Sequence, residues 1–160
     1  MPPVSALWPS FLAAAVAPTL VASLYFAVLS GGAPDVAFIA LLAFAIAAAH
    51  VIVLGIPSYV LLRRIGLLRW WSLTALGYVA GCIPVAIFLW PLRYAGPGSS
   101  SQENGVWTMI DGIPTTAGWL RYAGSVALLG MLGAVGAIAF WFSHKRLMRS
   151  NSSLERTPDR

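Results

Sequence analysis

The segment VAFIALLAFAIAAAHVIVLGIPSYVLLRRIGLLRWW, residues 36–71, decides the fold. Its first part, 36–62, contains no Lys, Arg, Asp or Glu, and its strongest polar outlier is His50. A helix of about 20 residues crosses the hydrocarbon core of a bilayer, so this part is long enough to span a membrane. Arg63, Arg64 and Arg69 then end the apolar run. We therefore predict a transmembrane helix over 36–62 that stops at a short arginine-rich turn.

Three other segments, 7–29, 70–92 and 122–143, have the same apolar character. Hydrophobic residues make up 59% of the chain and charged residues 9%, whereas a soluble domain carries about 25% charged residues. In lipid, a helix satisfies its own backbone hydrogen bonds. The sequence thus predicts an all-α integral membrane protein whose single domain, 1–143, is a four-transmembrane-helix bundle. A longer external loop, 93–121, and a disordered basic tail, 144–160, complete the predicted organisation.

The basic residues predict how the chain is threaded. Most of the 10 basic residues lie in the turn after residue 62 and in the tail, while Glu103 and Asp111 fall in the predicted external loop. Basic loops stay on the cytoplasmic side, so we expect both termini to be cytoplasmic. Several tryptophans also fall at the ends of the predicted spans, where indole prefers the headgroup level. The residues expected to set topology or to meet lipid headgroups are Arg63, Arg64, Arg69, Lys145 and Arg146.

His50 lies near the middle of its predicted span. An ionisable side chain inside a membrane is a functional hypothesis by default, and we group His50, Ser58, Pro57 and Pro84 as a candidate intramembrane polar site. Each proline leaves a backbone carbonyl without its helical partner. Two interpretations stay open: a neutral imidazole that bonds between helices, or a group that handles protons or ions along a pathway.

Glycines predict where helices approach closely. Gly77 and Gly81 form a GxxxG pattern in the third span, and Gly130 and Gly133 lie in the fourth. Small residues let two helix backbones touch in lipid. These glycines are expected to pack helices within one chain, with self-association as the alternative.

The external loop carries an apolar stretch, VWTMIDGIPTTAGW, residues 106–119. Its composition favours a position along the membrane interface, where it caps the bundle. Within it, Asp111–Gly112 is a turn signal, and TTAGW at 115–119 is typical of the start of a helix.

Missing motifs narrow the function. Cys82 is the single cysteine, which excludes an intrachain disulfide, a CxxC redox pair and a cysteine-based zinc site. The sequence has no phosphate loop, GxSxG elbow or HExxH motif, and every Asp and Glu lies outside the predicted spans, unlike in the small multidrug exporters. We predict neither an enzyme nor a protein with a metal or cofactor. The basic tail lacks the interleaved aromatic residues of a nucleic-acid-binding segment, so no nucleic-acid partner is expected.

Two runs, HVIVLGIPSYVLLRRIGLLRWW at 50–71 and IDGIPTTAGWLRY at 110–122, resemble small four-span proteins of the bacterial inner membrane. The resemblance extends from the second span to the fourth. It implies a bacterial inner membrane and brings no activity and no site residue with it. Because no catalytic constellation is found, we expect an accessory or assembly factor that acts through contacts with lipid, a membrane-protein partner or a second copy. The alternative is a transporter or channel subunit with His50 lining the pathway.

Overall fold

The computed structural model describes residues 7–29, 36–94 and 96–154, and it is mainly helical. Within these residues, four helices are long and apolar enough to cross a membrane, as the sequence predicts. The second of these contains a π-helical turn, Val51–Gly55, between α2 and α3, and a short 3-10 helix, Pro91–Tyr94, follows α4. The labelled elements are α1 (Trp8–Leu29), α2 (Val36–His50), α3 (Ile56–Arg64), α4 (Trp70–Phe88), β1 (Ser101–Glu103), β2 (Val106–Ile110), β3 (Ile113–Pro114) and α5 (Thr116–Leu154).

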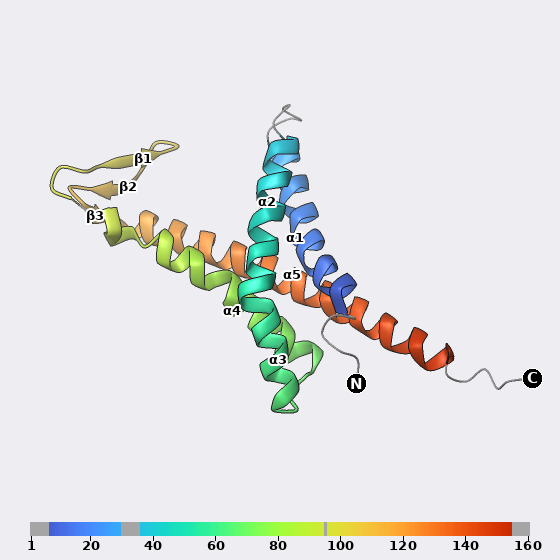
Figure 1. Ribbon diagram of the computed structural model, residues 1–160. Coiled ribbons are helices and arrows are strands. Elements are labelled where there is room, and N and C mark those ends of the chain that lie inside the picture. The colour runs from blue at the N-terminus through green and yellow to red at the C-terminus, as the bar shows by residue number, and fades with distance from the viewer. Residues whose placement is uncertain (1–6, 30–35, 95, 155–160) are drawn as a thin grey trace, which may run out of the picture.

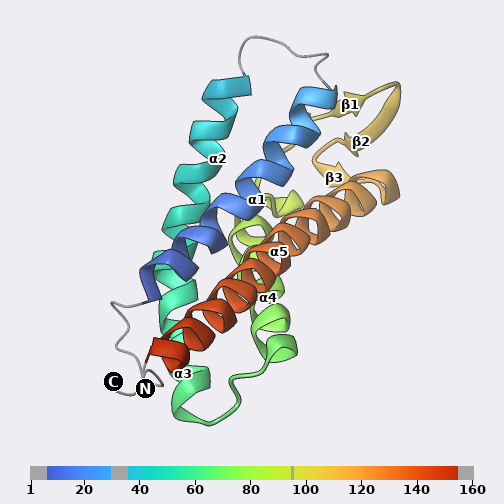
Figure 2. The same cartoon turned by 90° about the vertical axis from the view of Figure 1, so that its right-hand side faces the viewer.

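The helices form two pairs that open away from each other (Figure 1). The largest interface joins α4 to α5, and α1 crosses α5. By contrast, α2 packs mainly against α1, and none of its residues is buried within the chain. The start of α1, the α3–α4 connection and the last turns of α5 lie at one end, which we call the arginine end (Figure 2). The small sheet lies at the opposite end, the sheet end.

The core lies toward the arginine end. It consists of side chains from four helices and the residue before α1, and these are Leu7, Phe11, Ala14, Tyr59, Leu62, Leu73 and Phe140. The rings of Phe11, Tyr59 and Phe140 contact one another at centroid distances of 5.0 to 6.0 Å. Such aromatic contacts add about 0.5–1.5 kcal/mol each beyond the area that they bury. The two helix pairs are therefore joined at one end and diverge toward the other.

The prediction of an all-α fold misses a three-stranded antiparallel sheet in the external loop, in the order β1-β2-β3. Two tight turns build it. Asn104 and Gly105 have φ angles of 50° and 80°, and Asp111 and Gly112 have 51° and 78°. Positive φ at both central residues is the type I′ geometry that suits the twist of a hairpin. The predicted turn at Asp111–Gly112 is confirmed. The rest of the stretch 106–119 forms β2, β3 and the start of α5, with Thr115 between β3 and α5.

Two predicted boundaries differ from the structure. The last helix begins at Thr116, six residues before the predicted start at 122, in agreement with the helix start predicted from TTAGW. It also continues through Ser143 to Leu154, so residues 144–154 are helical where a disordered tail was predicted. The physical reason is that Lys, Arg, Leu and Met are good helix formers, and no Gly or Pro follows Gly136 within the helix. The end of the predicted tail, 155–160, lies outside the described residues.

Candidate functional site: an apolar groove between the helix pairs

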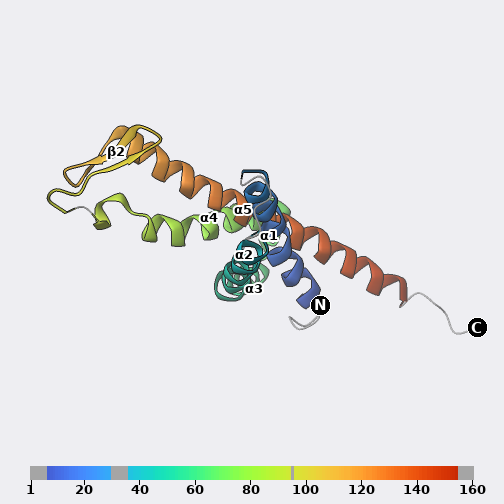
Figure 3. The same cartoon turned by 90° about the horizontal axis from the view of Figure 1, so that it is seen from above.

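The divergence of the two helix pairs leaves a groove with a volume of about 630 Å³. Helices α1, α2, α4 and α5, the π-helical turn and α3 all contribute to its walls. Viewed from above, α4 and α5 run toward the sheet end away from α1 and α2 (Figure 3). Its walls are formed largely by apolar side chains and glycines, and representative residues are Pro18, Ala22, Ala47, Ala80, Leu132 and Gly133.

A proline and a glycine fix the crossing of α1 over α5. Pro18 has no N–H, so the carbonyl of Ala14 lacks its partner in the helix. That carbonyl oxygen faces Gly136 of α5, where an added Cβ would lie 2.7 Å from it. The missing side chain lets the freed carbonyl lie against the α5 backbone. This crossing sets where the groove begins.

Glycines close the α4–α5 wall of the groove. A Cβ on Gly77 would lie 2.7 Å from the Gly133 carbonyl oxygen, and one on Gly81 would lie 2.5 Å from the Leu129 carbonyl oxygen. A Cβ on Gly130 would meet Cys82 Sγ at 2.6 Å. The four predicted packing glycines therefore bring the two backbones of one chain into contact. The glycine-bearing surfaces of α4 and α5 are thus covered by each other.

His50 is among the residues that line the groove, at the end of α2. Its Nδ1 lies 2.8 Å from the carbonyl oxygen of Ile46, one turn earlier in the same helix. A carbonyl only accepts, so Nδ1 carries the hydrogen and donates it. In a neutral ring, Nε2 is then an acceptor. Nε2 has no hydrogen-bond partner among the described residues. The first of the two interpretations placed this bond between helices, whereas the ring bonds to its own helix.

A π-helical turn follows His50. The N–H of Ile56 bonds to the carbonyl of Val51, five residues earlier. Pro57 comes next, and its ring would crowd the carbonyl of Val53 in a regular α-helix. A π turn widens the helix at such a point. The turn begins directly after the histidine, so it helps to set the position of the ring relative to α3.

The structure brings together only two of the four residues in the predicted intramembrane polar site. His50 and Ser58 line the groove. Pro57 is exposed on the surface, and Pro84 of α4 lies outside the groove lining. The role of Pro57 is therefore in the shape of the second helix, through the π turn before it.

Aromatic rings gather at the sheet end of α4 and α5. Trp90, Trp119 and Tyr122 meet edge to face, with centroids 5.6 to 6.0 Å apart. Tyr122 also donates a hydrogen bond of 3.0 Å to the Ala86 carbonyl. This cluster ties α4 to α5 at the opposite end from the core.

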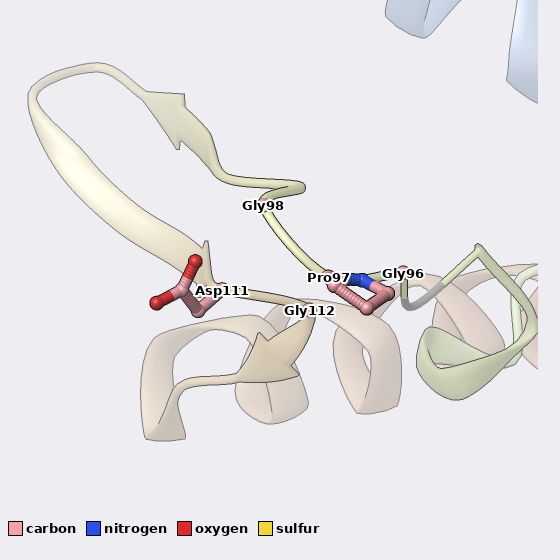
Figure 4. Close-up of a pocket in the computed structure, with 5 residues that line it drawn as sticks. All are labelled: Gly96, Pro97, Gly98, Asp111 and Gly112. Carbon is pink, nitrogen blue, oxygen red and sulfur yellow. The ribbon is translucent and has the colours of Figure 1, made fainter.

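The sheet end has a second, open pocket of about 490 Å³ (Figure 4). It is lined by Gly96, Pro97 and Gly98 on one side and by Asp111 and Gly112 on the other. The Asp111 carboxylate points away from the Pro97 ring in Figure 4. The pocket thus presents mainly glycine backbone, and we assign no chemistry to it. Within the described residues, no three His, Cys, Asp or Glu side chains gather as a metal site.

The predicted headgroup residues lie toward the arginine end. Arg64 and Arg69 are exposed around the α3–α4 connection, and Arg63 is half-buried there. Lys145 and Arg146 are exposed on α5, and Lys145 Nζ lies 5.4 Å from the centre of the Trp141 ring. The two basic regions therefore lie toward the same end of the molecule, away from the sheet (Figure 2).

Two features of the sheet end were missed in the sequence. The Asn104–Gly105 pair is a strong hairpin signal, and Glu103 beside it forms an ion pair with Arg121 that links the sheet to α5. The groove itself has no local sequence signal, because it depends on which helices pair. No family model matches the chain, and comparisons with curated proteins and with solved structures found no match either.

Proposed function

We propose that the chain is a multi-pass protein of a bacterial inner membrane, and that it acts as an accessory or assembly factor through contacts with an apolar membrane component. The groove is the observation that carries this proposal. A wall of small and aliphatic residues that opens toward lipid suits the binding of an apolar group and offers no catalytic pair. Four long apolar helices support the membrane location.

The charge distribution supports an orientation with both termini in the cytoplasm. The exposed Arg64, Arg69, Lys145 and Arg146 lie toward the arginine end, whereas Glu103 and Asp111 belong to the sheet end. Basic segments favour the cytoplasmic side and attract anionic headgroups by about 1 kcal/mol per cation near the surface. The sheet end then faces the periplasm.

The alternative role, as a transporter or channel subunit, needs a polar route from one side to the other. His50 and Ser58 are the feature that favours it. However, the groove ends at buried aromatic rings toward the arginine end, where Phe11 and Tyr59 are 4% and 2% exposed. We therefore favour contact over transport. Proton flux into liposomes that falls when His50→Ala is introduced would reverse this preference, because no other imidazole lines the groove.

Photocrosslinking tests the proposed contact directly. A photoreactive amino acid at position 80 faces the groove, and one at position 79 lies on the same turn of α4, outside the groove lining, where Val79 is 49% exposed. We expect irradiation of native membranes to give a distinct adduct from position 80 that position 79 lacks. The proposal fails if both positions give the same adducts, because the groove would then behave like any lipid-facing surface.

A further inference from the structure

We propose that the groove binds a single-chain lipid whose uncharged hydroxyl group donates a hydrogen bond to Nε2 of His50. This inference rests on the proposed function, because it names the apolar component that the groove contacts. It draws on the volume of the groove, the chemistry of its walls and the acceptor that His50 adds to them.

The volume of the groove suits one hydrocarbon chain. An apolar cavity of about 150 Å³ takes benzene, with its six carbons, so about 25 carbon atoms fill a groove of 630 Å³. A transmembrane helix 30 Å long and about 10 Å wide occupies roughly 2,400 Å³. A single long chain with a small head therefore fits within the groove, whereas most of a partner helix would lie outside it.

The side chains of the groove walls favour a lipid with an uncharged head group. Most lining residues are aliphatic or aromatic, and the hydroxyl side chains among them are uncharged: Thr19, Tyr25, Ser58 and Tyr59. The hydroxyl of Thr19 already donates a hydrogen bond of 2.8 Å to the Ala15 carbonyl. Among the described residues, no Lys, Arg, Asp or Glu lines the groove. A phosphate or carboxylate placed there would lose its hydration without gaining a counter-ion, which costs several kcal/mol. A neutral hydroxyl carries a far smaller cost, and one hydrogen bond offsets most of it.

His50 supplies that bond. Its Nδ1–H is engaged by the Ile46 carbonyl, so the ring keeps one orientation and one tautomer. The remaining nitrogen, Nε2, accepts and does not donate. The ring therefore distinguishes a hydroxyl from an ether or a ketone, which have no hydrogen to donate. His50 lies in the groove wall on the second helix, and not at the arginine end, where the groove ends at the rings of Phe11 and Tyr59. The lipid chain therefore extends along the groove walls from His50.

A route for entry lies along the flank of α2. That helix packs mainly against α1 and buries none of its residues. A lipid can thus reach the groove sideways from the bilayer without unfolding any interface. The occupant is expected to exchange with free lipid rather than to be trapped.

The test uses the full chain in nanodiscs and two probes, the 20-carbon prenyl alcohol geranylgeraniol and its methyl ether. We expect saturable binding of one alcohol molecule per chain. Membrane hydrogen bonds are modest, so the ether should bind roughly three-fold more weakly and at most about 20-fold. Wild-type protein that binds alcohol and ether equally would overturn the role of His50, and no saturable binding of either would overturn the lipid site.

Variants test separately the hydrogen bond to His50 and the binding of the lipid chain in the groove. His50→Phe should remove the preference for the alcohol, whereas His50→Gln keeps an acceptor oxygen and should retain it. Ala80→Phe fills the groove and should abolish binding of both probes, with Val79→Phe as the matched control that binds normally. A preference that survives in His50→Phe contradicts the proposal.

The two proposals can fail separately. A protein adduct from position 80 together with no alcohol binding would leave the contact function intact and remove the lipid. Equal adducts from positions 79 and 80 would remove the contact function itself.

Discussion

Replacing Gly133 by alanine should weaken the α4–α5 interface. A Cβ at this position would overlap the carbonyl oxygen of Gly77 and would lie 3.3 Å from the Cα of Gly81. Both are backbone atoms, so no change of rotamer can make room for the methyl group. The two helices must separate locally, and the contacts on either side of Gly133 loosen with them.

The expected magnitude follows from two opposing terms. Overpacking a close contact costs about 1–3 kcal/mol. Alanine, however, is favoured over glycine within a helix by about 1 kcal/mol. Gly124 lies on the same helix, and an added Cβ there would have no atom within 4 Å. Gly124→Ala therefore gains the helix propensity of alanine without the cost of overpacking. The difference in unfolding free energy between the two variants therefore isolates the packing term, at about 1–3 kcal/mol.

Equilibrium unfolding in mixed micelles measures this difference. The mole fraction of denaturing detergent is raised, and the helical circular dichroism of wild type, Gly133→Ala and Gly124→Ala is followed. We expect Gly124→Ala to equal or exceed wild type and Gly133→Ala to unfold first. Equal midpoints for the two variants would refute the reasoning, because the backbones of α4 and α5 could not then be in contact at Gly133.

Three further predictions concern the two ends of the molecule. Gly112→Ala places a side chain at φ 78°, 2.7 Å from the Gly96 carbonyl oxygen; we expect a loss of about 1 kcal/mol or more of local stability, seen as faster amide exchange in β2. His144→Phe keeps the ring that stacks on Phe140 and removes a buried Nδ1 that has no partner among the described residues; the melting temperature should hold or rise, and a fall would mean that Nδ1 is bonded. With reporters whose activity depends on the compartment, a fusion after the last residue should report the cytoplasm. An insertion in the Asn104–Gly105 turn should report the periplasm.

The long helices could be predicted because their signal is local. A run such as residues 36–62 is apolar throughout, and its length alone suits a helix that crosses a bilayer. Arg63 and Arg64 mark where that helix ends, and the structure ends α3 at Arg64. The turn at Asp111–Gly112 is local in the same sense, because positive φ selects these residues.

The sheet was missed although its signal is equally local. Asn104–Gly105 stands before VWTMI, a run of β-branched and aromatic residues with a polar residue inside it. The interfacial position was predicted from the apolar content of this loop, and the turn residues were not used. The extended C-terminal half of α5 was missed for a related reason: charge at 144–149 indicated a tail, while the helix propensity of Lys, Arg and Leu favoured continuation.

The groove could not be predicted because it arises from unequal pairing. Three helices carry features that fix a partner: glycines on α4 and α5, and the carbonyl of Ala14 on α1, which meets Gly136. The sequence of α2, VAFIALLAFAIAAAH, has no glycine and no polar residue before His50, so nothing in it selects one face over another. In the membrane location that we propose, no hydrophobic effect presses such a helix onto its neighbours. It therefore packs mainly against α1, and the space between α2 and the α4–α5 pair forms the groove in which we propose that a lipid binds.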